Sequence, residues 1–142
     1  ALGDIGIQLE LRYEDVPTWL KRVYHRYDFQ MNVNYFYQLP DPVLGVHRHY
    51  GTDQIRKGTH FVNSSRYSNP KLDALLDSGA GEPDAAKRTA AYKKIQQILA
   101  DDMPVVNLFE LEFLVVYNTK LKGAYGSAMG AYGSFREAYL DD

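Results

Sequence analysis

Tyr67-Ser-Asn-Pro-Lys-Leu-Asp73 opens the most informative part of this 142-residue chain, residues 67–109. Asn69 is a favourable N-cap, because its side chain can accept a hydrogen bond from a free backbone N–H group, and Pro70 fits the first helical turn. The leucines that follow fall on one face of the predicted helix: Leu72, Leu75 and Leu76. Gly79-Ala-Gly81 is predicted to end this helix.

A second, longer helix is predicted to start at Pro83-Asp84. Its apolar stripe opposes a face of lysine and glutamine residues, and consists of Ala91 or Tyr92, Ile95, Ile98 and Leu99. Pro104 stops the helix and favours extended geometry in the residue before it. An apolar strand is therefore predicted over residues 105–117. Taken alone, this stretch indicates two surface helices packed on a sheet.

The amino-terminal third predicts a βαβ unit. Apolar and polar residues alternate from Ile5 to Leu11 and again from Phe29 to Tyr37, which is the period of a strand. Between them, Val16, Trp19, Leu20 and Val23 follow helical spacing, with Asp15 as a cap. A strand, a helix and a strand within residues 5–37 favour parallel pairing with a right-handed crossover.

The carboxyl end of the second predicted strand is the candidate ligand-binding position. Ligands of open α/β sheets bind outside the carboxyl ends of strands. This rule selects the run Tyr35-Phe36-Tyr37-Gln38, three aromatic side chains and one amide. The alternative is that this strand end is tucked under the long loop predicted over residues 39–66.

Two carboxylates interrupt the late strand. Glu110 and Glu112 fall on one face among valines and leucines, so they must be solvated or paired. They could face a wet ligand cleft, or bulk water at the rim of a sheet. Both interpretations are compatible with the sequence.

Composition excludes several classes of protein. The net charge of −2 argues against a dedicated nucleic-acid binder, and the absence of cysteine excludes disulfides and thiolate metal sites. No apolar run reaches membrane-spanning length. His47-Arg-His49 suggests zinc, with His60 or Asp41 as further ligands, but no recognised zinc motif supports it. We expect no enzyme activity, no metal and no cofactor.

Several motifs together resemble the carboxy-terminal lobe of ABC-transporter extracytoplasmic solute-binding proteins of the dipeptide/oligopeptide-binding class. Each motif is loose alone, and it is their order along residues 2–125 that carries the resemblance. They are Leu2-x-x-Ile5-Gly6-Ile7, the pair Asp41-Pro42, Tyr67-x-Asn69-Pro70-x-x-Asp73, Asp84-x-x-x-Arg88-x-x-x-Tyr92-x-x-x-Gln96-x-Ile98-Leu99, Pro104 and Lys122-Gly123.

The resemblance implies an α/β fold: a fragment of a periplasmic-binding-protein-like lobe, with the βαβ unit, two further helices and a long returning strand. Residues 1–122 would form part of the ligand-binding lobe, and residues 123–142 a Gly/Tyr-rich tail returning toward the missing lobe and ending in a short helix. The implied function is non-catalytic capture of a peptide-like or other polar organic solute between two lobes, for an ABC importer. The implied location is periplasmic or extracytoplasmic, the implied partners are permease subunits, and the fragment is expected to self-associate. The alternative is a free-standing α/β protein-interaction module with no transport role.

The resemblance also assigns ligand contacts. In such proteins the turn before the Asp-Pro pair contacts bound peptide, and an aspartate there holds its amino terminus. Gln38 occupies that position here, and an amide cannot neutralise an ammonium group. Glu110 is the candidate for the missing charge. The predicted ligand-binding residues are Tyr35, Phe36, Tyr37, Gln38, Asp41 and Glu110.

Overall fold

Two helices joined by a short turn form the centre of the computed structural model, which describes residues 2–112, 114–126 and 129–142. Helix α3 spans Pro70–Gly81 and helix α4 spans Ala85–Asp102. The predicted cap of α3 is confirmed, because Asn69 Oδ1 accepts hydrogen bonds from the backbone N–H groups of Lys71 at 3.0 Å and Leu72 at 3.3 Å. Asp84 caps α4 in the same way.

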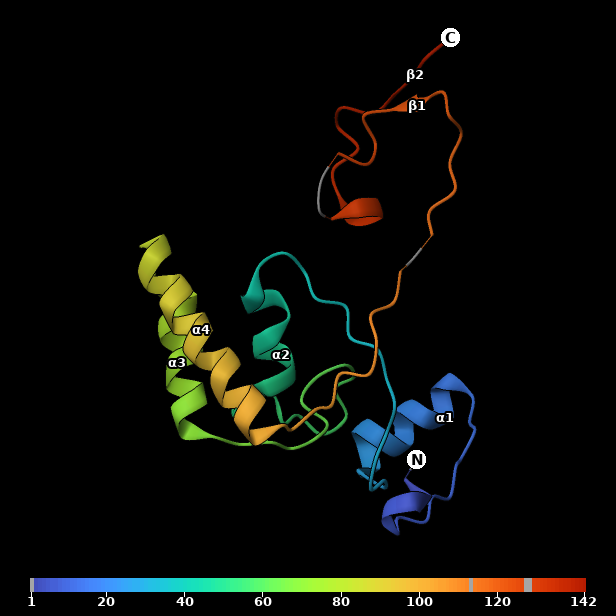
Figure 1. Ribbon diagram of the computed structural model, residues 1–142. Coiled ribbons are helices and arrows are strands. Elements are labelled where there is room, and N and C mark those ends of the chain that lie inside the picture. Colours follow the sequence, from blue (N-terminus) through green and yellow to red (C-terminus); the bar gives the residue numbers. More distant parts are fainter. Residues whose placement is uncertain (1, 113, 127–128) are drawn as a thin grey trace.

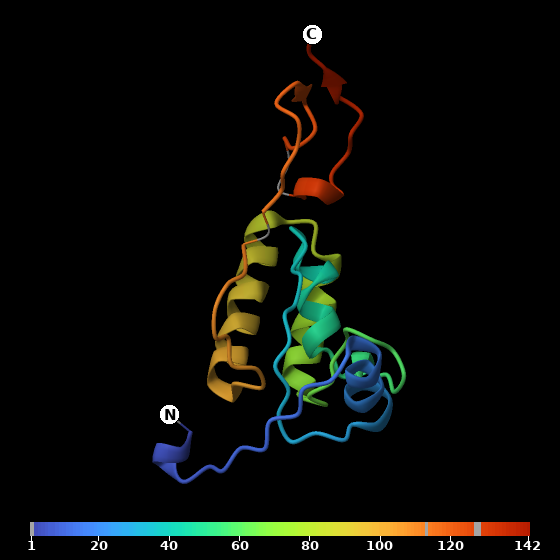
Figure 2. The same cartoon turned by 90° about the vertical axis from the view of Figure 1, so that its right-hand side faces the viewer.

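The core of the chain lies between these helices. Leu72 and Leu76 of α3 and Ile95 of α4 are buried against one another. Gly79 is buried in the last turn of α3, where an added Cβ would lie 3.2 Å from the ring of Tyr92. Helix α2 (Val46–Tyr50) packs beside the pair, as Figures 1 and 2 show. Partly buried residues complete this cluster: Val46, Tyr50, Tyr67, Leu75, Tyr92, Ile98 and Leu99.

A smaller cluster surrounds the amino-terminal helix. Helix α1 (Val16–Leu20) begins at the predicted cap Asp15, whose side chain accepts a hydrogen bond from Thr18 N at 2.8 Å. It continues into wider helical turns, η2 (Lys21–Arg26). Val23 and Tyr24 are buried there with Val62, beneath the side chains of Trp19, Leu20 and Phe29.

The three predicted strands do not pair in the described part of the chain. Residues 7–15 and 31–39 have no regular secondary structure, and neither do residues 106–112 and 114–118 of the late segment, where residue 113 lies outside the described residues. Ile5 ends a single 3₁₀ turn, η1 (Gly3–Ile5). The βαβ unit is therefore absent here, because alternation sets the faces of a strand but a strand forms only on a hydrogen-bonding neighbour.

The described residues contain one small sheet, at the end of the chain. Strand β1 (Leu121–Lys122) pairs antiparallel with β2 (Tyr139–Leu140). The tail thus folds back on itself through the 3₁₀ turn η5 (Gly130–Tyr132), and the short helix predicted at its end does not form. The tail stands apart from the helices in Figures 1 and 2, and meets residues 31–39 through the rings of Tyr132 and Tyr37.

The predicted long loop, residues 39–66, contains short helices, and hydrogen bonds hold it in place. The turns η3 (Pro42–Leu44) and η4 (Thr52–Gln54) flank α2. The buried Asn63 side chain donates hydrogen bonds to Gly51 O at 3.0 Å and Tyr67 O at 2.9 Å. A further hydrogen bond, from Thr52 N to Asp73 Oδ1 at 2.9 Å, joins the segment to α3.

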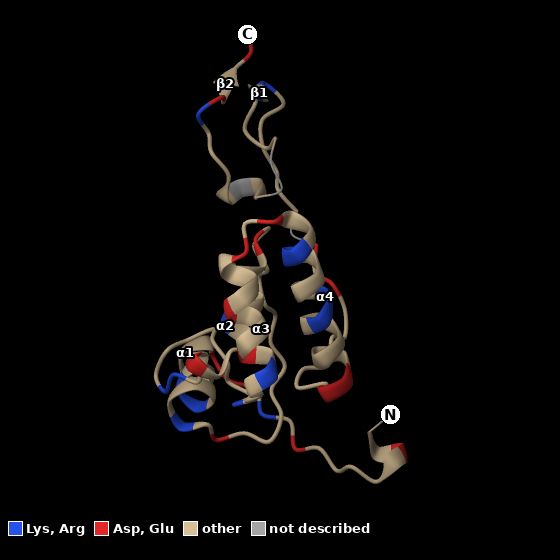
Figure 3. Cartoon of the chain, turned by 90° about the vertical axis from the view of Figure 1, so that its left-hand side faces the viewer, with Lys and Arg blue, Asp and Glu red and all other residues tan. Residues whose placement is uncertain are grey.

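Charge and hydropathy give no dominant face. Figure 3 shows acidic and basic residues intermingled on α3 and α4, and both signs of charge also occur in the carboxy-terminal tail. Within the described ranges, each helix is too short or too polar to cross a membrane.

Candidate functional site

The predicted aromatic run borders a cavity of about 210 Å³. Tyr35, Phe36 and Tyr37 line it from one side, and Arg48 of α2 and Phe61 complete the wall. Three of the residues predicted to bind ligand therefore border a cavity, and their role in binding stays a prediction. Sequence reasoning missed Arg48 and Phe61, because they come from a segment that the sequence indicated only as loop.

Arg48 supplies the cavity with a cation. Its Nη2 donates a hydrogen bond to the Tyr37 carbonyl oxygen at 3.2 Å, which fixes the guanidinium beside the aromatic run. The Nε atom of Arg48 is buried and has no hydrogen-bond partner among the described residues. Because this Nε atom is buried, a ligand would meet the outer Nη groups of the guanidinium, whose planar geometry suits a carboxylate. The flanking rings can pack on the apolar part of the same ligand.

Gln38, predicted to contact ligand, is instead paired with His49. Gln38 Nε2 lies 3.0 Å from His49 Nδ1, and the His49 ring packs on Phe36 with the ring centroids 3.8 Å apart. Burial of His49, with a smaller effect from the Arg48 cation, lowers the pKa of the imidazole to about 4. The ring is therefore neutral near pH 7. The His49 ring, held by Gln38, packs on Phe36 and so orients this lining residue. Gln38 itself does not line the cavity.

Gly45 makes the position of Gln38 possible. A Cβ added to Gly45 would lie 1.9 Å from Gln38 Oε1, so a larger residue here would require the Gln38 side chain to move. The turn before α2 and the end of residues 31–39 are consequently in direct contact.

The two acidic residues predicted to contact ligand, Asp41 and Glu110, do not line the aromatic cavity. Asp41 caps η3 by accepting a hydrogen bond from Val43 N at 2.9 Å, and it pairs with Arg88 of α4 at 2.8 Å. These two interactions lower the pKa of the Asp41 carboxyl group. Glu110 is exposed in the irregular segment after α4 and is not among the residues that line the cavity.

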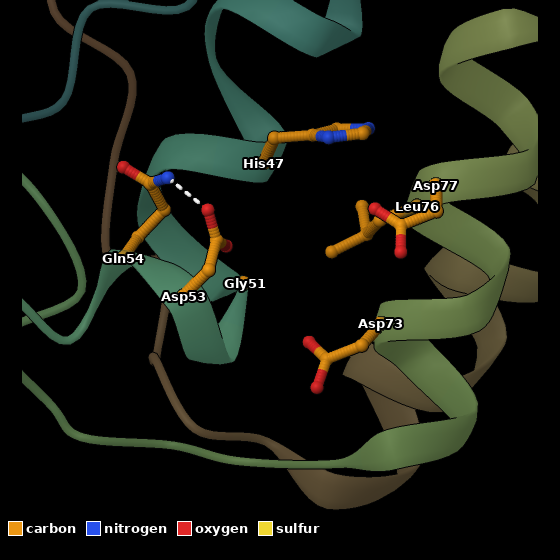
Figure 4. A pocket seen from close by; sticks show the side chains of 7 residues that line it. All are labelled: His47, Gly51, Asp53, Gln54, Asp73, Leu76 and Asp77. Carbon is orange, nitrogen blue, oxygen red and sulfur yellow. Dashed lines mark hydrogen bonds between the residues drawn. The ribbon is translucent and has the colours of Figure 1, made fainter.

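A second cavity, also of about 210 Å³, lies between α2, η4 and α3 (Figure 4). Asp73 Oδ1 accepts a hydrogen bond from Thr52 N at 2.9 Å, so the Asp73 carboxylate joins η4 to α3. His47 Nε2 lies 3.0 Å from the Tyr92 hydroxyl, and burial lowers the His47 pKa. The lining residues are His47, Gly51, Asp53, Gln54, Asp73, Leu76 and Asp77.

The zinc arrangement considered for His47 and His49 does not form. His47 pairs with Tyr92, whereas His49 pairs with Gln38 and packs on Phe36. In the part of the chain that the structure describes, no three His, Asp or Glu side chains converge in a way that could hold a metal ion.

Comparison with known proteins gives two partial relatives. The chain is 28% identical over 124 residues to the probable D,D-dipeptide-binding periplasmic protein of Escherichia coli strain K12. The aligned residues make up 87% of this chain and 23% of that protein. It is 35% identical over 66 residues to protein XP55 of Streptomyces lividans, covering 46% of this chain and 12% of that protein.

The chain thus spans about a quarter of the length of the first relative and about an eighth of the second. No family model matches the chain, and no solved structure matches it. The likeness to a periplasmic dipeptide-binding protein extends over most of residues 1–142 and supports a distant relationship with solute-binding proteins of this kind.

Proposed function

We propose that this chain is a ligand-contacting part of an extracytoplasmic solute-binding protein that delivers peptide-like solutes to an ABC importer. The single observation that carries the proposal is the cavity in which Arg48 stands beside Tyr35, Phe36, Tyr37 and Phe61. The distant likeness to a dipeptide-binding protein supports the same class of ligand.

The chemistry of the cavity suits the carboxyl end of a short peptide. The Arg48 guanidinium can pair with the terminal carboxylate, and the rings can cover the last side chain. The amino terminus of the ligand would bind elsewhere, since Gln38 is neutral and engaged by His49. In the proposed protein a second lobe closes over the ligand, and permease subunits receive it.

One observation favours the alternative, a protein-interaction module. Large apolar side chains stay exposed along the segments predicted as strands: Ile5, Leu11, Met31, Val33, Leu108, Phe109, Leu114 and Val116. An exposed apolar surface of this kind is typical of association with another protein segment. Ligand binding separates the two functions, because an interaction module needs no small solute.

Isothermal titration calorimetry of the chain with D,D- and L,L-dipeptides tests the proposal, with the C-terminal amide of each dipeptide as its partner. We expect the free acids to bind and the amides to bind about 10- to 100-fold more weakly, because a hydrogen bond to a charged group is worth roughly 1.5–3 kcal/mol. Arg48→Gln should weaken binding of the acids to a similar degree.

The matched control is Arg56→Gln. Arg56 is exposed, pairs with Asp53 at 3.5 Å and does not line the aromatic cavity. It should leave affinity unchanged. Equal affinity for acid and amide would contradict the role of Arg48, and absence of binding across the panel would favour the interaction module.

A further inference from the structure

Two histidines that lie far apart in the sequence meet at the surface. The Nε2 atoms of His25 and His60 are 2.9 Å apart, and their ring centroids are 5.1 Å apart. Both side chains belong to exposed residues. Neither residue lines the aromatic cavity, so this pair is independent of the proposed function.

The surrounding backbone holds the pair together. His25 lies in the last turn of η2, and Gly58 N donates a hydrogen bond to Tyr24 O at 2.8 Å, which brings the loop before His60 over that turn. Gly58 has φ +88°, a conformation that favours glycine, and a Cβ added there would lie 3.8 Å from the His25 ring.

Aromatic contacts orient the His60 ring. It packs on the ring of Tyr24 at 5.8 Å and on that of Phe61 at 6.5 Å between centroids. Tyr24 is itself buried in the cluster with Val23 and Val62. The side chain of His60 is thus positioned from the core of the amino-terminal part, before any ligand arrives.

The separation of the two nitrogens is that of a hydrogen bond, and it also equals the spacing of two ligands on one metal ion. Imidazole nitrogens bind divalent transition metals at about 2.0–2.1 Å. Two such ligands at a right angle are therefore about 2.9 Å apart, whereas a tetrahedral angle separates them by about 3.3 Å. The observed 2.9 Å fits adjacent positions in a square-planar or tetragonal site, the geometry that Cu²⁺ prefers.

We propose that His25 and His60 form a two-histidine binding site for a divalent transition metal ion of the Cu²⁺ type. Without metal, one ring donates its Nε2 proton to the other ring. With metal, the donor ring exchanges its proton with solvent and takes the Nδ1–H tautomer. Both neutral rings then bind the ion through Nε2, and water occupies the remaining positions. No third His, Asp or Glu joins them among the described residues, so these positions stay exchangeable.

The neighbouring charges set the strength of the site. Arg26 and Lys57 are close in sequence to the two histidines and repel a cation. Because the pair is exposed, solvent and salt weaken this repulsion. The affinity should therefore be below that of a buried three-ligand site.

Titration of the tag-free chain, acetylated at its amino terminus, with Cu²⁺ in a buffer that does not bind the ion, followed by electron paramagnetic resonance, tests the proposal. We expect one Cu²⁺ per chain with coupling to two protein nitrogens. His25→Gln and His60→Gln should each lose one nitrogen coupling and at least about 10-fold in affinity, with far-UV circular dichroism confirming that the fold is kept.

His47→Gln is the control, since His47 faces the other cavity and should leave Cu²⁺ binding unchanged. The proposal is overturned if the wild-type chain takes up no Cu²⁺ in this buffer, or if either paired histidine can be replaced without loss. An equal loss in the His47→Gln variant would also overturn it, because the ion would then lie elsewhere.

Discussion

At the scale of single residues, His49 links the candidate site to the stability of the chain. It is only 2% exposed, its Nδ1 pairs with Gln38, and its Nε2 has no hydrogen-bond partner among the described residues. A protonated imidazole would place an unpaired charge in this buried position beside Arg48. The neutral form is therefore the one that the fold accepts.

This environment predicts a pH dependence of the free energy of unfolding. The pKa of His49 is 6.5 when unperturbed and about 4 in the fold, so between these values the unfolded chain binds a proton that the folded chain does not. Stability contributed by this group is complete above about pH 6.5 and falls as the pH is lowered toward 4. The full difference amounts to at most about 3 kcal/mol.

Urea denaturation at pH 7 and pH 5 measures this effect. The His49→Gln variant keeps a polar side chain but cannot titrate, so its stability should change much less between the two pH values. A variant with the same pH slope as the wild-type chain would show that another group is responsible.

The residue scale also shows what the sequence could tell about the site. The rule on strand ends selects Tyr35-Phe36-Tyr37, and these residues border a cavity although they are not in a strand. Their role in ligand binding stays a prediction. Arg48 is not selected by the sequence, because it lies between two histidines in a segment that the sequence indicates as loop. A single arginine in a loop carries no periodic signal, and only packing brings it beside residues 35–37.

At the scale of elements, α3 and α4 depend on a few side chains buried between them. Leu72 is fully buried against Leu76 and Ile95. Leu72→Ala should lower the free energy of unfolding by about 2–5 kcal/mol, because it removes apolar contacts and leaves a cavity. Leu44→Ala, at a residue that is 54% exposed, is the control and should change it by less than about 0.5 kcal/mol. Urea titration compares them, and equal effects would contradict this packing.

The elements differ in how far the sequence could predict them. Caps are local: Asp15, Asn69 and Asp84 each bind an N–H group two or three residues ahead, so the helix starts could be read directly. Strand pairing is not local. Exposure alternates over residues 31–37 in the opposite sense to the prediction, since Asn32, Asn34 and Phe36 are half-buried and the apolar residues between them are exposed. Nothing in that segment specifies its neighbour.

At the scale of the whole molecule, the main feature is that segments predicted as strands expose large apolar side chains. Leu114 is 91% exposed and Val116 is 96% exposed, and residues 114–118 have no regular secondary structure. We expect the chain to self-associate through such segments, so its mass by light scattering should rise with concentration. Replacing both residues by lysine should reduce the rise, whereas Ala90→Lys on the exposed face of α4 should not. A mass that stays monomeric at all concentrations would contradict this expectation.

The central proposal is that a solute binds at the cavity formed by residues 35–37, Arg48 and Phe61. Nuclear magnetic resonance mapping of backbone amide shifts during titration with a dipeptide tests it directly. We predict that the largest shifts fall on Tyr35, Tyr37 and Arg48, and that they disappear in the Arg48→Gln variant. Shifts confined to the acidic cavity around Asp73 and Asp77, or no saturable shifts with any dipeptide, would contradict it.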